Sequence, residues 1–311
     1  MQARRAVYFW AFLAVVLLAM TPFASASAYS NLFVYGDSLS DLGNIYAASG
    51  HTIPQSPPYY MGRFSNGPLA VEYLAKTLNT PLTSFAWGGA TTGIGNSGDS
   101  GSQTNVGMHG LPGMLPEVAG SLSAVAPFAK TSLFVVWGGP DDYLTGGTVS
   151  QGVADILFMV GQLQSVGATH ILVPGMPDLG LTPFYLAQGS TKAALATAFS
   201  LAFDQALQHG LPNGVTYYDT FGFMNLVVSH PGAFGFTNVT DPCLVALTPC
   251  SPKIQVQNQY LFWDDLHPTT AADQLLAEQF TRAVTPEPTT LLMLGTGIAG
   301  LAGVVRRKLS A

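Results

Sequence analysis

The sequence predicts an α/β fold, in which a parallel β-sheet is covered by helices on both faces within one domain. Short apolar segments of strand length alternate with longer segments whose apolar residues recur every three or four positions. The short segments are rich in β-branched and aromatic residues and end in turn-forming Gly, Asp or Ser. Strand and helix patterns that alternate in this way are typical of a parallel sheet, because each crossover between parallel strands is a helix. The chain shows no internal repeat.

Five segments have the strand pattern, at residues 33–36, 82–87, 132–137, 169–174 and 215–219. Helical spacing predicts helices over residues 71–78, 115–125, 153–163, 195–206 and 270–280. Asn66 is expected to cap the first of these helices, and Thr270-x-x-Asp273 resembles a capping box that opens the last. Residues 44–65, 93–110 and 221–259 are expected to be irregular. Tyr59 and Tyr60 are expected to pack the first of these loops rather than line a groove.

The first strand ends in a turn that carries a candidate nucleophile. Gly36-Asp37-Ser38 places a serine hydroxyl at the carboxyl edge of the sheet, where open α/β folds bind ligands. Far along the chain, residues 263–268 read Trp-Asp-Asp-Leu-His-Pro and supply an Asp-x-x-His pair. A serine activated by a histidine that a carboxylate orients is the arrangement for acyl transfer. We therefore predict that Ser38 is the nucleophile, His267 the general base and Asp264 the residue that orients His267.

Four sequence blocks, in order and spanning roughly residues 31–283, resemble the signature blocks of the GDSL (SGNH-hydrolase) lipase/esterase family. They are Gly36-Asp37-Ser38-Leu39-Ser40-Asp41-x-Gly43-Asn44, Gly62-Arg63-Phe64-Ser65-Asn66-Gly67-Pro68, Phe85-Ala86-Trp87-Gly88-Gly89-Ala90-Thr91-Thr92 and Phe262-Trp263-Asp264-x-x-His267-Pro268-Thr269. The resemblance implies a three-layer α/β/α sandwich with a mainly five-stranded, flavodoxin-like parallel sheet. It implies cleavage of carboxylic esters through an acyl-enzyme on Ser38, without a cofactor or metal. Short-chain esters, lipids and acylated polysaccharides are all substrates that suit the family.

The resemblance also implies three hydrogen-bond donors for the oxyanion of the tetrahedral intermediate. They are the amide of Ser38, the amide of Gly89 (with Gly88 as the alternative), and a side chain at position 141. The family commonly has asparagine at that third position, whereas this chain has Asp141. An ionised carboxylate has no proton to donate and repels the developing charge.

Three explanations of Asp141 stay open. The carboxyl group is protonated in a desolvated site, or the enzyme works slowly with two donors, or the domain is a non-catalytic relative. Two functions of different class therefore stand. The first is an exported serine esterase. The second is a surface or matrix binding protein, inactive or weakly active, on an SGNH-hydrolase fold.

Both ends of the chain have the pattern of targeting segments. Residues 1–28 combine an arginine pair, a short apolar run and small residues, as a secretory signal peptide does. Residues 286–311 begin Pro-Glu-Pro, continue with an apolar segment long enough to span a bilayer, and close with a basic cluster. This pattern resembles the PEP-CTERM sorting signal of Gram-negative bacteria, which an exosortase-like protease is thought to process; an ordinary C-terminal anchor is the alternative.

The catalytic domain is therefore expected to be residues 29–285. We expect it in the periplasm, at the cell surface or in the extracellular matrix, after passage through the secretion machinery and membrane-anchored before processing.

The net charge and the two cysteines limit the kinds of partner and ligand that this domain is expected to bind. Removing both ends takes away five of the 11 basic residues and one of the 17 acidic residues, which leaves a net charge of −10. Nucleic acid is excluded as a partner because phosphate binding needs a basic surface. Cys243 and Cys250 are the only cysteines, and we expect export to join them in a disulfide. A metal pair is the lesser alternative, because no histidine lies close to them in the sequence.

Overall fold

The computed structural model describes residues 29–285. The strands are β1 Leu32–Gly36, β2 Leu82–Ser84, β3 Leu133–Trp137, β4 His170–Pro174, β5 Val215–Tyr218, β6 Asn238–Pro242, β7 Leu244–Val245, β8 Thr248–Pro249 and β9 Tyr260–Phe262. The α-helices are α2 Asn44–Ala48, α3 Ala70–Leu78, α4 Met114–Val125, α5 Pro140–Leu144, α6 Val149–Ser165, α7 Pro183–Ala187, α8 Ser190–Gly210, α9 Thr220–Ser229, α10 Ile254–Gln257 and α11 Thr270–Val284. Four short 3₁₀ turns lie at Ser97–Asp99, Ala126–Phe128, Leu179–Leu181 and Pro231–Phe234.

The central sheet has five parallel strands in the order β2-β1-β3-β4-β5. This is the flavodoxin-like order, so the predicted fold class is confirmed. The chain leaves β1, forms β2 on one side of it, and then crosses to β3 on the other side. Ligands bind in open sheets of this kind at the carboxyl ends of the strands where the order reverses. In this chain that point lies between β1 and β3.

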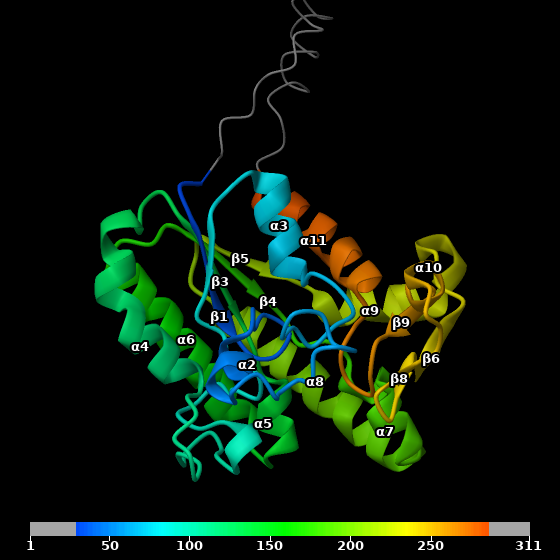
Figure 1. Ribbon diagram of the computed structural model, residues 1–311. Coiled ribbons are helices and arrows are strands. Elements are labelled where there is room, and N and C mark those ends of the chain that lie inside the picture. The colour runs from blue at the N-terminus through cyan, green and yellow to red at the C-terminus, as the bar shows by residue number, and fades with distance from the viewer. Residues whose placement is uncertain (1–28, 286–311) are drawn as a thin grey trace, which may run out of the picture.

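Helices cover both faces of the sheet (Figure 1). Alternate residues of the strands build a separate hydrophobic core on each face. Phe33, Tyr35 and Phe134 face α4, α6 and α8 on one side. Val34 and Val135 face α3 and α11 on the other. Because neighbouring residues of a strand point to opposite faces, a strand buried on both faces must be apolar throughout. That is why the strands were visible in the sequence as continuous apolar runs.

Two stretches that were expected to be irregular contain regular elements. The loop 44–65 opens with the single helical turn α2, and residues 221–259 hold most of α9 together with β6, β7, β8 and α10. Helix α9 was not predicted because its own residues are apolar on nearly every side. It therefore has no polar face that would reveal a helical period. The second strand ends at Ser84, three residues earlier than predicted.

The two capping predictions were wrong in an informative way. The side chain of Asn66 accepts a hydrogen bond from the amide of Thr270 at 2.8 Å, the first residue of α11. The carboxylate of Asp273 accepts from the amide of Ala70 at 3.2 Å, the first residue of α3. Each residue therefore caps the other helix rather than its own. Sequence spacing along one helix gives no sign of such an exchange, which requires the two helices to pack side by side.

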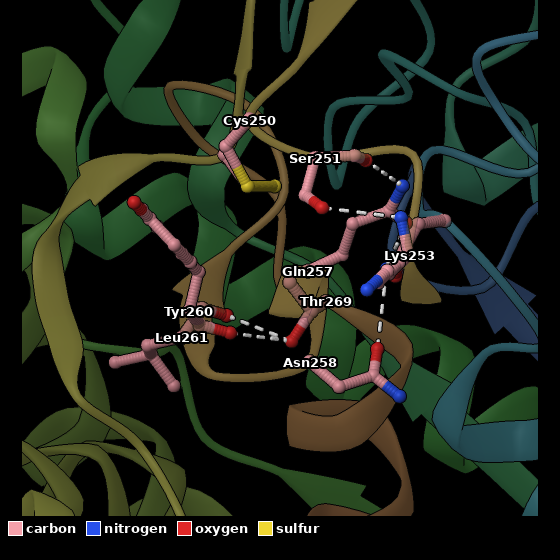
Figure 2. The surroundings of a disulfide bond; sticks show 10 residues. Cys250, Ser251, Lys253, Gln257, Asn258, Tyr260, Leu261 and Thr269 are labelled. Carbon is pink, nitrogen blue, oxygen red and sulfur yellow. Dashed lines mark hydrogen bonds between the residues drawn. A yellow bond between two sulfur atoms is a disulfide. The ribbon is translucent and has the colours of Figure 1, made fainter. Parts of the chain in front are cut away.

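A disulfide joins Cys243 and Cys250 in the structure and closes the small hairpin of β7 and β8 (Figure 2). Next to it, β9 pairs with β6 and leads into the loop that precedes α11. The hydroxyl of Thr269 donates to the carbonyl of Tyr260 at 2.7 Å and so ties the two ends of that loop together. The loop between them carries Asp264 and His267.

Residues 29–285 contain no helix long and apolar enough to cross a bilayer. The predicted signal peptide and the apolar segment of the sorting signal lie outside the described residues.

Candidate active site

Three segments that are distant in the sequence meet at the carboxyl edge of the sheet. Ser38 follows β1, Asp141 follows β3, and His267 lies in the loop between β9 and α11. All three line one cavity of about 290 Å³, together with Gly88 and Gly89. The cavity therefore lies at the point where the strand order reverses, as the parallel topology requires.

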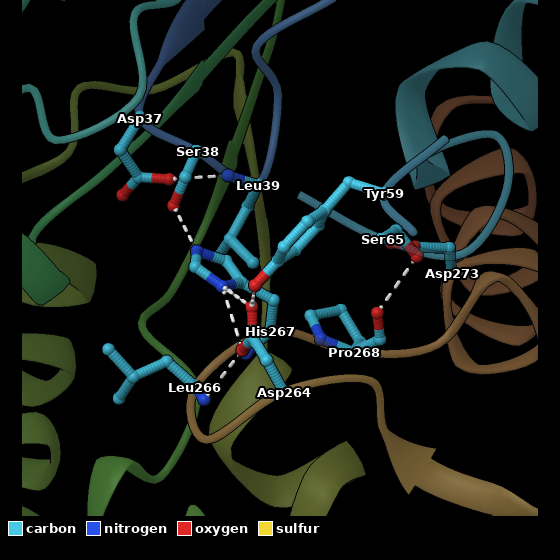
Figure 3. Close-up of polar contacts among 10 residues, drawn as sticks. All are labelled: Asp37, Ser38, Leu39, Tyr59, Ser65, Asp264, Leu266, His267, Pro268 and Asp273. Atoms are coloured by element: carbon cyan, nitrogen blue, oxygen red, sulfur yellow. Dashed lines mark hydrogen bonds and ion pairs between the residues drawn. The ribbon is translucent and has the colours of Figure 1, made fainter. Parts of the chain in front are cut away.

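Ser38, His267 and Asp264 form a continuous chain of hydrogen bonds (Figure 3). The Nε2 atom of His267 lies 2.7 Å from the hydroxyl oxygen of Ser38. Its Nδ1 atom lies 2.8 and 2.9 Å from the two carboxylate oxygens of Asp264. Because an ionised carboxylate only accepts, Nδ1 carries the proton, and Nε2 is left to accept from the serine hydroxyl. The structure brings the three predicted residues together, and their roles in a reaction stay a prediction.

The Asp-x-x-His spacing works because Asp264 shapes its own loop. Its Oδ1 atom accepts from the amides of Leu266 at 2.9 Å and His267 at 2.7 Å. These bonds close a turn of the Asx type, which aspartate favours. The turn brings the imidazole of His267 back over the carboxylate. The Asp264 side chain therefore fixes both the backbone conformation of the loop and the orientation of the ring.

Tyr59 packs against its neighbours, as expected, but its hydroxyl also makes a contact that the sequence did not predict. Its hydroxyl donates to Oδ2 of Asp264 at 2.6 Å, across 205 residues of sequence (Figure 3). Its ring packs edge-on against Trp263. Nothing in the local sequence distinguishes Tyr59 from Tyr60, which makes no such bond. Only the folded Pro-rich loop brings the hydroxyl to Asp264.

The hydrogen bonds around Asp264 determine its ionisation. Burial raises the pKa of this carboxyl group, but protonated His267 and the bonds from His267 and Tyr59 outweigh burial, so the pKa lies below its ordinary value. For His267, burial lowers the pKa, but Asp264, Asp37 and Asp141 outweigh it and raise the pKa above the ordinary value. Asp264 is therefore ionised at neutral pH and favours the imidazolium.

Phe64 covers the imidazole of His267, with ring centroids 4.9 Å apart. It also lies against Gly88, where an added Cβ would come within 2.5 Å of the Phe64 ring. The aromatic residue of the Gly-Arg-Phe-Ser-Asn block thus holds the histidine in place and requires glycine at position 88.

The structure favours Gly89 over Gly88 as an amide donor. The amide of Gly88 donates to Asp41 at 2.7 Å and is therefore occupied. Among residues 29–285, the amides of Gly89 and Ser38 have no protein acceptor. Gly89 has φ +83°, in the left-handed region that favours glycine. Both unpaired amides belong to residues that line the cavity.

The segment that carries Gly89 is fixed at both ends by buried carboxylates. Asp41 holds Gly88, and Asp142 accepts from the amide and the hydroxyl of Thr92 at 3.0 and 2.8 Å. Rigid placement matters because an oxyanion donor contributes only when it is already aimed at the developing charge.

Asp141 lies where the family's asparagine is expected, with only 6% of its surface exposed. Its Oδ1 atom accepts from the hydroxyl of Ser97 at 2.6 Å, which leaves Oδ2 without a bond to the described residues. Burial raises the pKa of Asp141 to about 6, against the Ser97 bond and the charge of His267. Near neutral pH the carboxyl group is therefore ionised more often than protonated.

Asp37 is a second buried carboxyl group, which sequence reasoning did not single out. Its Oδ1 accepts from the amide of Leu39 at 2.9 Å, and its buried Oδ2 has no partner among the described residues. Burial, and then the charge of Asp141, raise the pKa of Asp37 to about 8. The charges of Asp37 and His267 act on each other: the imidazolium lowers the pKa of Asp37, and the carboxylate raises the pKa of His267.

No group of three or more His, Cys, Asp or Glu residues in the described range 29–285 could hold a metal ion.

Comparison with known proteins identifies two sequence patterns in this chain. The GDSL-like lipase/acylhydrolase family matches residues 32–280, and the PEP-CTERM protein-sorting motif matches residues 284–308.

Two curated relatives match a large part of the chain. A thermolabile hemolysin of Vibrio parahaemolyticus is 28% identical over 268 residues, covering 78% of this chain and 61% of the relative. A phosphatidylcholine-sterol acyltransferase of Aeromonas hydrophila is 31% identical over 196 residues, covering 60% of this chain and 56% of the relative. The chain thus spans less than two thirds of the length of either protein. Among solved structures, an acetylxylan esterase of Geobacillus stearothermophilus matches 84% of this chain and 96% of its own at 14% identity, with a TM-score of 0.46.

The Tyr59 bond makes a prediction about the imidazole. In Tyr59→Phe the carboxylate of Asp264 loses a donor, so it attracts the imidazolium more strongly and the pKa of His267 should rise further. The measurement is titration of His267 by NMR in both proteins. Tyr60→Phe is the matched control, because no bond of the Tyr60 hydroxyl to the described residues is present. Equal pKa values of His267 in wild type and Tyr59→Phe would show that Tyr59 acts through packing alone.

Proposed function

Because the chain belongs to the GDSL-like lipase/acylhydrolase family, we propose that it is an exported serine esterase that hydrolyses carboxylic esters through an acyl-enzyme on Ser38. The observation that carries the proposal is the hydrogen-bonded chain from Ser38 through His267 to Asp264, which opens into a cavity with two unpaired amides.

In the first half of the reaction, the Ser38 oxygen attacks the ester carbonyl carbon and gives its proton to Nε2 of His267. The carbonyl oxygen becomes negatively charged and accepts hydrogen bonds from the amides of Ser38 and Gly89. The bond from the carbonyl carbon to the alcohol oxygen then breaks, and His267 returns its proton to that oxygen. Asp264 stabilises the imidazolium throughout and keeps the ring aligned.

In the second half, water attacks the acyl-enzyme and His267 takes a proton from it. The bond between the acyl carbon and the Ser38 oxygen breaks, and the proton on His267 returns to Ser38. The products are an alcohol and a carboxylic acid, and no cofactor is consumed.

The relatives favour a lipid or another ester of a carboxylic acid as the substrate. The Aeromonas relative is a phosphatidylcholine-sterol acyltransferase, and phosphatidylcholine is an ester of fatty acids. An acylated polysaccharide is the second substrate class. The PEP-CTERM motif at residues 284–308 supports export and processing by an exosortase-like protease.

A second candidate function rests on Asp141. A carboxylate at the third oxyanion position fits a surface or matrix binding protein whose site is weakly active or inactive. It is the less favoured function, because the hydroxyl, the imidazole and the carboxylate of the triad are all in bonding distance.

A panel of p-nitrophenyl esters tests the enzyme against the binding protein. Residues 29–285 should hydrolyse at least one ester, and Ser38→Ala should be inactive. His267→Ala should lose several orders of magnitude in kcat/KM, because Ser38 then has no base. Asp264→Ala should lose somewhat less. Hydrolysis that is equally fast in wild type and His267→Ala would eliminate the proposed mechanism.

The substitution Asp141→Asn should increase activity near neutral pH. Its Oδ1 can still accept from Ser97, and its new amide can donate to the oxyanion. A single donor of this kind contributes on the order of 100-fold in rate. The measurement is kcat/KM from pH 5 to 10, with Asp265→Asn as the control, since Asp265 is an exposed neighbour of Asp264.

The pH profiles should differ in shape as well. Asp141, with its pKa raised to about 6, must hold a proton to donate, whereas His267, with its pKa raised above the ordinary value, must have lost one. Wild type should therefore be most active at the pH at which Asp141 and His267 together hold one proton, and its activity should decline at alkaline pH. Asp141→Asn should instead rise to an alkaline plateau, with its midpoint lowered by the loss of a negative charge near His267. A large loss of activity in Asp141→Asn would contradict this account of Asp141.

A further inference from the structure

A second pocket lies directly behind the loop that carries His267. It has a volume of about 80 Å³ and is lined by residues of α9, α11 and β9. Val227 of α9, Phe262 of β9 and Leu276 of α11 contribute to its walls. It is separate from the cavity that holds Ser38, and no step of the proposed reaction uses it.

The pocket shares a wall with the active-site cavity. Leu39, Pro177 and Leu266 line both the pocket and the cavity of the triad. Leu39 follows the nucleophile in the sequence and Leu266 precedes the histidine. A group attached to the Ser38 oxygen therefore reaches the pocket when these shared side chains move apart.

The lining of the pocket is mostly apolar and is suited mainly to hydrocarbon. None of its residues is ionisable, and its side-chain hydroxyls come from Thr182 and Thr220. The Thr182 hydroxyl donates to the carbonyl of Leu179 at 2.7 Å. The buried Thr220 hydroxyl has no partner among the described residues. Apolar cavities of this kind stay dry and bind apolar molecules.

We propose that this pocket binds the distal part of the acyl chain of the ester, which makes the enzyme selective for medium-chain acyl groups. The proposal rests on the proposed function. The volume is about half that of the ~150 Å³ cavity that holds a benzene molecule, so it fits roughly three or four carbons of a chain. Allowing for the carbons that pass Leu39 and Leu266, we expect a preference for hexanoyl to octanoyl esters.

The covalent chemistry favours the acyl chain over the alcohol as the occupant. The acyl carbon bonds to the Ser38 oxygen, one residue from Leu39, whereas the alcohol must leave before water enters. The larger cavity of about 290 Å³, which includes the partly exposed Ile53 and Leu144, offers the alcohol a path to solvent.

The experiment compares p-nitrophenyl octanoate with p-nitrophenyl acetate as the ratio of their kcat/KM values. Ala272 lines the pocket from α11, and Ala272→Leu should fill it. The ratio should fall at least tenfold, since each methylene excluded from a fitted pocket lowers kcat/KM by about tenfold or more. Ala198→Leu, at an exposed position of α8, is the matched control and should leave the ratio unchanged.

A complementary variant should act in the opposite direction. Thr220→Val keeps the shape of the side chain and removes a buried hydroxyl without a partner, so the octanoate-to-acetate ratio should rise. An unchanged ratio in both Ala272→Leu and Thr220→Val would overturn the proposal while leaving the esterase intact. Ala272→Leu could instead lower kcat/KM for octyl acetate and not for p-nitrophenyl octanoate. That result would assign the pocket to the alcohol and overturn the acyl proposal.

A binding measurement separates this proposal from the proposed function. Calorimetric titration of Ser38→Ala with octanoate should show binding, and adding Ala272→Leu should weaken it at least tenfold. If wild type hydrolyses no ester and yet this difference appears, the esterase proposal fails and the acyl pocket stands. If octanoate binds equally to both variants, or to neither, the pocket proposal is overturned.

Discussion

The ionised carboxylate of Asp264 is the feature on which the candidate active site depends. A buried charge is stable only when hydrogen bonds and an opposite charge replace the water that it has lost. Asp264 accepts from two amides of its own loop, from His267 and from the hydroxyl of Tyr59. Satisfying this one group folds the loop, orients the imidazole toward Ser38 and anchors the Pro-rich segment 44–65 to the site.

Hydrogen bonding of backbone amides to buried carboxyl groups recurs elsewhere in the fold. Only 9% of the residues of the chain are charged, and several of its carboxylates serve as acceptors for backbone amides rather than as surface charges. Asp41 fixes Gly88, Glu117 accepts from the amide that ends β1, and Asp273 caps α3. Asp141 differs from these groups, because its one bond is to a side chain and its second oxygen is unpaired. For this reason a change in the protonation of the Asp141 carboxyl group can alter the chemistry of the site.

The sequence was sufficient for the five parallel strands and most of the helices that cover them. It also singled out Ser38, Asp264 and His267, which the structure brings together and whose roles stay a prediction. These features have local signals: continuous apolar runs, helical spacing, and an Asp-x-x-His pair that can be satisfied within one loop. The rest depends on contacts between distant segments. The bond from Tyr59 to Asp264, the exchanged caps of α3 and α11, and the apolar pocket behind Leu266 each need folded segments to meet. Helix α9 was missed because it is apolar on nearly every face.

Reaction of Ser38 with a fluorophosphonate probe tests the central claim most directly, because the probe bonds only to a serine oxygen that a neighbouring base has activated. Intact mass and peptide mapping should find one phosphonyl group, on Ser38, in the folded protein. The group should be absent from Ser38→Ala and should form far more slowly in His267→Ala. Modification at another serine of the cavity such as Ser97, or no modification of the folded protein at all, would contradict the account.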